Sequence, residues 1–313
     1  MDYYELAERV INEVEKVVIG KRHVIEKVFC AVLAGGHVLI EDIPGLGKTT
    51  LATAFSKAMG LECSRVQFTP DVLPSDVTGF SMYDAKKDEM VFRPGPIFCN
   101  LFLADEINRT SPKSQSALLE VMEEGKVSID GISYEMDKPF TVIATQNPSG
   151  SAGTQLLPES QLDRFMIRLK IGYPSGNDEL RILVSKRAGH EVTVEQVLSK
   201  ASLLKMKEMV DSVYIHEKVL KYIVTLVNAT RNNEYLELGS SPRGGICLCK
   251  MASAKAFLSG RDYVIPEDVA YVFSDVISHR VIMGAGARMK HLDRAQILAD
   301  ILAGVEKPRI SSR

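Results

Sequence analysis

The sequence has no large excess of charge of either sign and no long uninterrupted apolar run. It carries 38 basic and 40 acidic residues, which give a formal net charge of −2 at pH 7. This balance argues against an extensive nucleic-acid-binding surface, although it leaves room for a local basic patch. The most apolar region, residues 28–40, is interrupted by Gly35, Gly36 and His37, so we predict no membrane-spanning segment. Residues 1–5 are acidic and amphipathic, so we expect no secretion signal there.

Cysteine is scarce, and the six histidines form no ligand cluster. The five cysteines, an odd number set in apolar surroundings, indicate reduced thiols packed in a core, and hence a cytoplasmic protein. The spacing of Cys247 and Cys249 would suit a metal site. They lie in a predicted helix with no second Cys/His pair near it, however, which favours core thiols. The other three are Cys30, Cys63 and Cys99.

The pattern of hydrophobic residues changes part-way along the 313 residues, 45% of which are hydrophobic. Up to residues 173–176, short apolar runs alternate with helical patterns, and this stretch itself reads as a linker because it contains Pro174 and Gly176. Beyond it, almost everything has the 3.6-residue period of helices. We therefore predict an α/β domain over residues 1–174 and a smaller, all-helical domain over residues 175–313.

The stretch 38–50, VLIEDIPGLGKTT, is the strongest motif of the chain. An apolar run ends in a Pro/Gly turn that leads directly into a helix-forming segment, which is the context of a phosphate-binding loop. Glycines let backbone N–H groups surround a phosphate, and the helix N-terminus favours its negative charge. One position departs from the usual G-x-x-x-x-G-K-[ST] pattern, because Asp42 stands where the first glycine is expected.

The residue types of this loop predict how it would hold a nucleotide. Lys48 is predicted to reach the β- and γ-phosphates, and the Thr49 hydroxyl to bind Mg²⁺. The candidate nucleotide-binding residues of the loop are Pro44, Gly45, Leu46, Gly47, Lys48, Thr49 and Thr50.

The second motif is the stretch 100–106, NLFLADE. An apolar run too short for a helix ends in two acids, which fits a buried parallel strand with carboxylates at its C-terminal edge. We predict that Asp105 holds Mg²⁺, directly or through water, and that Glu106 orients and deprotonates the water that attacks the γ-phosphate. The alternative is a strand that ends in a solvated acidic turn, and the phosphate-binding loop upstream disfavours it.

Two further stretches point to the same site. Residues 140–145, FTVIAT, read as another buried strand, and Asn147 follows it. Its amide could hydrogen-bond the γ-phosphate or the attacking water, unless Asn147 and Pro148 merely make a turn. Val18 and Ile19 lie where the chain turns ahead of the phosphate-binding loop and could lay their backbone against an adenine. Core packing explains these two residues equally well.

Segments 79–93 and 126–136 are predicted β-hairpins. The first has a charged tip at residues 84–89, and the second turns at Asp130-Gly131, one of the best short hairpin signals. Between them, Ser111 and Pro112 start a predicted helix that stops at Gly125. The charged tip of the first hairpin is either solvated surface or an insertion that contacts a partner.

Taken in chain order, the phosphate-binding loop, Asp105-Glu106, Asn147, Arg164 and the trailing helices resemble an AAA+ ATPase. The finer pattern resembles the MoxR branch, in which Asp42 also has a counterpart. The matching stretches are 41–49 (EDIPGLGKT), 73–79 (LPSDVTG), 105–109 (DEINR), 144–148 (ATQNP), 157–165 (LPESQLDRF) and 239–243 (GSSPR). The resemblance implies an α/β fold of the AAA+ P-loop type, with a parallel sheet flanked by helices, followed by a helical lid.

The resemblance also implies roles for two arginines. Arg164 would be an arginine finger that enters the nucleotide site of the neighbouring subunit, and Arg243, on the lid, would be a second sensor that touches the phosphates in cis. For either arginine taken alone, an ordinary surface ion pair is the alternative.

At the level of the assembly, the resemblance implies an Mg²⁺-dependent ATP hydrolase that forms a homo-oligomeric ring, expected to be a hexamer. Such proteins act in chaperone-like remodelling or maturation of protein complexes, with partners that carry von Willebrand factor A domains. The two hairpins would line the central pore of the ring, with Tyr83 and Tyr134 as candidates for gripping a partner protein.

Two other functions compete with this interpretation. An ATPase that acts on nucleic acid is disfavoured by the acidic net charge and by the lack of an appended DNA-binding module. A scaffold that senses ATP without hydrolysing it is disfavoured because Glu106 and Arg164 are both present, and a pure sensor could dispense with them.

Overall fold

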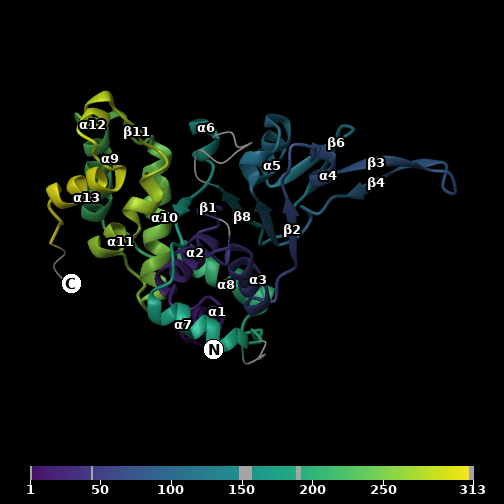
Figure 1. The fold of residues 1–313 in the computed structure, drawn as a ribbon, viewed down its shortest axis with the longest axis horizontal. Coiled ribbons are helices and arrows are strands. Elements are labelled where there is room, and N and C mark those ends of the chain that lie inside the picture. Colours follow the sequence, from purple (N-terminus) through teal and green to yellow (C-terminus); the bar gives the residue numbers. More distant parts are fainter. Residues whose placement is uncertain (1, 44, 148–156, 188–191, 310–313) are drawn as a thin grey trace.

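The structure, a computed structural model, describes residues 2–43, 45–147, 157–187 and 192–309. Figure 1 shows a sheet flanked by helices, a helical segment at one side of it and a two-stranded hairpin that projects from the other side. Pro44 and Pro148, which belong to two of the sequence motifs, lie outside the described residues.

A five-stranded sheet forms the centre of the first half of the chain. Its strand order is β2-β5-β8-β1-β9, and every neighbouring pair is parallel. Because the strands are parallel, the loops that follow β1, β5 and β8 leave the same edge of the sheet. The strands are β1 (Val38–Glu41), β2 (Cys63–Gln67), β5 (Leu101–Asp105), β8 (Thr141–Gln146) and β9 (Ile167–Leu169).

Alternate residues of the central strands enter two hydrophobic clusters, one on each face of the sheet. On β5, Leu101 and Leu103 belong to one cluster, whereas Phe102 and Ala104 belong to the other. All five residues of β5 are buried, which explains its unbroken apolar sequence. Residues of α1 (Tyr3–Glu15), α2 (Arg22–Leu33) and α3 (Lys48–Ala58) enter the first cluster, and residues of α5 (Pro112–Glu124) enter the second.

The helix predicted between Ser111 and Gly125 is confirmed as α5. The Ser111 hydroxyl accepts a hydrogen bond from the Ser114 backbone N–H at 3.3 Å and so caps the N-terminus. Gly125 ends the helix with φ +65°, a left-handed conformation that glycine adopts without a steric penalty. Three short helices lie nearby in the sequence: α4 (Pro74–Thr78), η1 (Ile107–Arg109) and α6 (Glu159–Leu162).

Both predicted hairpins are confirmed as antiparallel pairs. The first consists of β3 (Gly79–Asp84) and β4 (Glu89–Pro94), and the second of β6 (Lys126–Ile129) and β7 (Ile132–Glu135). The second turns at Asp130 and Gly131, which both have positive φ, as a tight two-residue hairpin requires.

The two hairpins touch each other through a pair of aromatic rings. Phe92 of β4 and Tyr134 of β7 stack with their ring centroids 4.1 Å apart. The β3–β4 hairpin extends beyond this contact and projects away from the body of the molecule (Figure 1). Its exposed hydrophobic side chains, each more than 40% accessible, are Phe80, Met82, Tyr83 and Met90.

The second half of the chain is mostly helical, as predicted, but it also contains a small antiparallel sheet. Its strands have only three and two residues, too few to show the period of two that reveals a strand in a sequence. The elements are α7 (Gly176–Arg187), α8 (Lys200–Asp211), α9 (Glu217–Arg231), β10 (Leu236–Leu238), α10 (Pro242–Leu258), α11 (Pro266–Ile277), β11 (Ile282–Met283), α12 (Ala285–Met289) and α13 (Arg294–Gly304).

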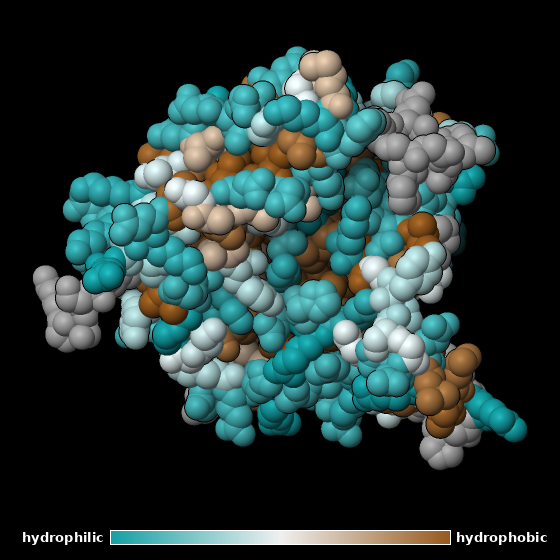
Figure 2. Space-filling view, turned by 60° about the vertical axis from the view of Figure 1, so that its left-hand side comes forward, coloured by the Kyte–Doolittle hydropathy of each residue, from teal (hydrophilic) through white to brown (hydrophobic). Residues whose placement is uncertain are grey.

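The helical segment shares a hydrophobic core with the first half of the chain. One continuous cluster contains Val10 of α1, Phe29 of α2, Leu248 of α10 and Phe273 of α11. The predicted domain boundary near residue 174 therefore stays a prediction, because apolar packing continues across it. Figure 2 shows that the face on the side of the helical segment is mainly hydrophilic, with hydrophobic residues mostly in recesses. Within the described ranges, no helix has the length and apolar character needed to cross a membrane.

Candidate nucleotide site

The phosphate-binding loop joins the C-terminal end of β1 to the N-terminus of α3, as the sequence predicts. Gly45 and Gly47 have φ values of +89° and +83°, which favour glycine at both positions. A Cβ atom built on either glycine would meet no other atom within 4 Å. The loop therefore leaves open space beside its backbone, directly at the start of a helix, where a phosphate group would fit.

Asp42, the departure from the usual loop pattern, has a structural reason. Its carboxylate accepts hydrogen bonds from the backbone N–H groups of Ile43 at 3.0 Å and Gly172 at 2.7 Å. The second of these bonds ties the start of the loop to the chain that leaves β9. Glycine could not make either contact, so Asp42 anchors the loop with a side chain where other loops rely on backbone freedom.

Lys48 lies at the first position of α3 and is almost fully buried. Its ammonium donates a hydrogen bond to the Asp42 carbonyl oxygen at 2.6 Å. Burial lowers the pKa of Lys48, although the nearby carboxylates of Asp105, Asp42 and Glu106 act in the opposite direction. The lysine is thus within electrostatic reach of the acidic residues of the second motif.

A cavity of about 950 Å³ adjoins the loop. Gly45, Leu46, Gly47, Thr49 and Thr50 line one side of it, and the chain between α1 and α2 lines another through residues that include Val18 and Ile19. Further residues of α3, the stretch 171–174, residues of α7 and the stretch 192–194 line the rest of it. Val18 also belongs to the hydrophobic core. The structure therefore brings the predicted adenine-facing segment to the phosphate-binding loop. Val18 also packs in the core, so the alternative explanation applies to it too.

The two acids and Asn147 meet at the edge of the sheet next to this loop. Thr145, on β8, donates a hydrogen bond to the Asp105 carboxylate at 2.6 Å and accepts one from the Glu106 backbone N–H at 2.8 Å. The Asn147 amide donates to the Glu106 carboxylate at 3.2 Å. Asn108 is hydrogen-bonded to the backbone of Asn147 in both directions, at 3.2 Å each. These contacts fix the three predicted residues relative to one another.

Glu106 has a left-handed backbone conformation, with φ +57° and ψ +46°. This conformation costs a non-glycine residue about 1 kcal/mol or more, and such strain is concentrated at functional sites. Arg109 pairs with the Glu106 carboxylate at 2.7 Å. This hydrogen bond is the main reason why the pKa of Glu106 lies below its ordinary value, so the side chain is ionised at neutral pH.

Asp105 is paired with a cation that the sequence did not reveal. The Arg65 guanidinium, from β2, donates to the Asp105 carboxylate at 2.8 and 3.2 Å. β2 lies beside β5, and Gln67 is opposite Asp105 in the register, so an arginine two residues earlier on β2 is within reach of it. The sequence does show that Arg65 lies in a short strand. It does not show that this strand pairs with the strand that carries Asp105.

The residues present fit an Mg²⁺ site that is completed by a nucleotide. Within the described parts of the chain, no group of three or more His, Cys, Asp or Glu side chains could hold a metal ion alone. The Thr49 hydroxyl and the Asp105 carboxylate are both oxygen ligands of the type that Mg²⁺ prefers. Mg²⁺ commonly binds to one or two protein oxygens together with phosphates and water, and these two side chains match that pattern.

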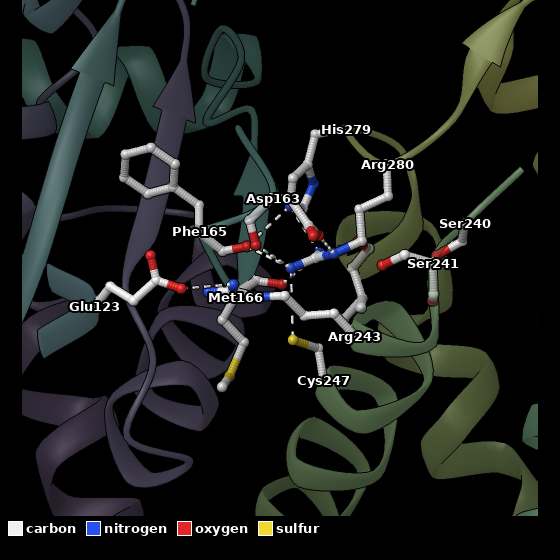
Figure 3. A network of polar contacts seen from close by, with 11 residues as sticks. Glu123, Asp163, Phe165, Met166, Ser240, Ser241, Arg243, Cys247, His279 and Arg280 are labelled. Carbon is white, nitrogen blue, oxygen red and sulfur yellow. Dashed lines mark hydrogen bonds and ion pairs between the residues drawn. The ribbon is translucent and has the colours of Figure 1, made fainter. Parts of the chain in front are cut away.

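Arg164 and Arg243 lie away from the cavity and share one carboxylate. The Arg164 side chain is 3.2 Å from Glu123 at the end of α5, and Arg243, at the start of α10, is 3.1 Å from the other oxygen of Glu123. Neither arginine lines the cavity beside the phosphate-binding loop. Figure 3 shows Arg243 and Glu123 beside a polar network of Asp163, His279 and Arg280. The roles predicted for both arginines remain predictions.

Comparisons with known proteins agree with this geometry. Residues 37–167 match a family described as "ATPase family associated with various cellular activities (AAA)", and residues 228–301 match an AAA lid domain. The chain is 45% identical to the Bacillus subtilis protein YeaC over 98% of this chain and 96% of that protein. It is 37% identical to "Chaperone MoxR1" of Mycobacterium tuberculosis over 97% of this chain and 83% of that protein.

A solved structure resembles the whole fold. A crystal structure from Cytophaga hutchinsonii, described as that of a candidate ATPase, superimposes with a TM-score of 0.90 at 39% identity. The match covers 98% of this chain and 96% of the other. The fold, the order of the motifs and these relatives lead to one conclusion: this chain belongs to the MoxR family of AAA+ ATPases.

Proposed function

We propose that this protein is an Mg²⁺-dependent ATP hydrolase that works as a homo-oligomeric ring, a hexamer, in chaperone-like remodelling of protein complexes in the cytoplasm. The observation that carries the proposal is the cluster of Asp105, Glu106 and Asn147 beside Lys48 at the edge of the sheet. Its members are one candidate metal ligand, one ionised base and one amide. They follow β5 and β8, at the same edge of the parallel sheet as the loop after β1, which has open space for phosphates.

Within this proposal each side chain of the site has its own role. Thr49 and Asp105 would hold Mg²⁺, which would supply positive charge to balance that of the phosphates. Glu106 accepts a proton from the attacking water, and Asn147 orients that water or the γ-phosphate. The Asn147 Oδ1 atom is buried and has no hydrogen-bond partner among the described residues, so it is available for such a contact. Val18 and Ile19 line the adenine end of the cavity.

The two arginines extend the proposal to a neighbouring subunit. As the family resemblance implies, Arg164 acts as a finger on the nucleotide of an adjacent copy. Arg243 would act on the phosphates of its own subunit. Both arginines are bound to Glu123, so each must leave this carboxylate before it can meet a phosphate.

Two features support a protein partner. One relative is named a chaperone. The projecting β3–β4 hairpin exposes Phe80, Met82, Tyr83 and Met90, which suits contact with a protein surface. We propose proteins with von Willebrand factor A domains as partners, as the family resemblance implies. All five cysteines are free thiols, which agrees with a reducing compartment, but the predicted core packing is wrong for Cys63, which is exposed.

The test of hydrolysis is the substitution Glu106→Gln. We expect the variant to bind ATP with unchanged affinity and to turn it over at least ~10²-fold more slowly, because a positioned general base contributes about that factor. Phosphate release and the binding of a fluorescent ATP analogue measure the two quantities. Glu208→Gln, at an exposed residue that pairs with Lys205 on α8, is the matched control and should retain full turnover. Equal rates in the Glu106 variant and the wild type would refute the role given to Glu106.

A further inference from the structure

A buried arginine of the helical segment holds the turn that carries Arg164. Arg280 lies between α11 and β11, and its side chain is 2% exposed. Its Nε donates to the Asp163 carboxylate at 2.7 Å, and its Nη2 donates to the carbonyl oxygens of Asp163 at 3.2 Å and Phe165 at 2.6 Å. Its Nη1 donates to the Met166 carbonyl oxygen at 3.1 Å. Figure 3 shows these groups converging on one guanidinium.

Residues next to Arg280 add contacts between the same two stretches. His279 Nε2 lies 3.0 Å from the Phe165 carbonyl oxygen, and burial lowers the pKa of His279 well below its ordinary value, so the ring is neutral. Arg168, at the centre of β9, donates to the Ser278 carbonyl oxygen at 3.2 Å. The stretch 278–280 is thus joined to the stretch 163–168 by both side chains and backbone.

The arrangement holds the backbone on either side of Arg164 and leaves its side chain outside the network. The backbone carbonyl oxygens of Asp163 and Phe165, the two neighbours of Arg164, both accept hydrogen bonds from the Arg280 guanidinium. The Arg164 guanidinium is bound to the partly exposed carboxylate of Glu123 instead. A side chain that contacts another subunit needs a fixed backbone and an accessible charged group. Arg164 has both.

We propose that Arg280 is a positioning residue for Arg164: it ties the turn 163–166 to the helical segment and thereby sets where the finger reaches the neighbouring subunit. This inference rests on the proposed shared site. It makes the location of the finger depend on the helical segment that Arg280 belongs to. If Arg280 only stabilised the fold, its loss would impair the nucleotide site of its own subunit. Assemblies that mix two variants distinguish this from a displaced finger.

The test uses Arg280→Gln in the full chain. We expect it to bind the fluorescent ATP analogue as the wild type does, because Arg280 does not line the nucleotide cavity. We expect kcat to fall by at least about tenfold, because a displaced finger loses part of the ~10³–10⁵ in rate that such arginines supply. Arg261→Gln is the matched control: this half-buried arginine pairs with Asp268 in the same segment and makes no contact with the turn. It should keep its turnover.

Mixed assemblies give the readout that a structural role would not produce. Subunits with Arg280→Gln have an intact Glu106, and subunits with Glu106→Gln have an intact finger. Mixing the two should recover turnover, because the finger of the second completes the site of the first. Arg164→Ala mixed with Glu106→Gln is the reference pair and should recover in the same way.

Each outcome decides the question. If turnover recovers in the reference pair but not in the mixture with Arg280→Gln, the inference is wrong and the proposed function stands. Wild-type turnover of Arg280→Gln alone has the same meaning. No recovery in the reference pair overturns the shared site, and the inference with it. If Arg280→Gln fails to fold, Asp163→Asn replaces it in the same mixture. This variant removes the carboxylate that Arg280 binds but keeps its shape, and it should show a weaker form of the same recoverable loss.

Discussion

At the scale of single residues, Glu106 is controlled by its neighbours. Arg109, three residues along the chain, donates a hydrogen bond to one oxygen of the Glu106 carboxylate, and Asn147 donates one to the other. Both contacts favour the charged form of Glu106, and they outweigh the burial that would favour the neutral form. A general base must be unprotonated to accept a proton. By lowering the pKa of Glu106, Arg109 keeps the carboxylate ionised at lower pH.

This control predicts a change in the pH profile for Arg109→Gln. Removing the guanidinium should raise the pKa of Glu106 toward its ordinary value, so the acid limb of kcat/KM should move to higher pH. At pH 8 the carboxylate is ionised in both proteins, so kcat should stay within about threefold of the wild type. Rates of phosphate release between pH 4 and pH 8 measure the profile. Arg288→Gln, at an exposed arginine that pairs with Glu237, is the control. An unmoved acid limb would contradict the role given to Arg109.

At the scale of elements, the phosphate-binding loop is anchored at both of its ends. One end begins α3 at Lys48, and the other is tied through Asp42 to the chain that follows β9. Since Gly172 also lines the nucleotide cavity, this bond connects the loop to another segment of the cavity lining. Loop geometry and cavity shape therefore depend on one carboxylate.

The anchor predicts the effect of Asp42→Ala. The substitution removes two hydrogen bonds between a carboxylate and backbone N–H groups, each worth about 1 kcal/mol or more, so ATP affinity should fall about tenfold. Titration with a fluorescent ATP analogue measures the change. Asp84→Ala is the matched control, because Asp84 accepts a backbone hydrogen bond in the hairpin tip and lies away from the cavity. If both variants bound ATP equally well, the anchoring role would be wrong.

At the scale of the whole molecule, the proposed site is complete only when another copy contributes Arg164. We therefore expect the mass in solution, measured by light scattering, to increase to that of a ring when ATP is added to the Glu106→Gln variant. Lys48→Ala, which loses the phosphate contact, should keep the same mass with and without ATP. A wild-type chain that hydrolysed ATP at full rate as a monomer would contradict the shared site.

The sequence by itself determined the central strands of the sheet and the residues that follow them. The apolar runs that end in Glu41, Asp105 and Gln146 become β1, β5 and β8, because strands buried on both faces need apolar side chains throughout. Parallel pairing then brings their C-terminal ends together, so the loop around Lys48, the acids and Asn147 could be assigned before the structure was known.

Only the tertiary structure decided which distant side chains meet. Arg65 and Asp105 are 40 residues apart in the sequence, and Arg280 and Asp163 are 117 residues apart. Glu123 of α5 joins Arg243 of α10 to Arg164, which lies in the turn between α6 and β9. Local patterns show which face of an element is buried and where a turn begins, because those properties depend on near neighbours. Pairing across the fold depends on how whole elements pack, and no local pattern in a sequence records it.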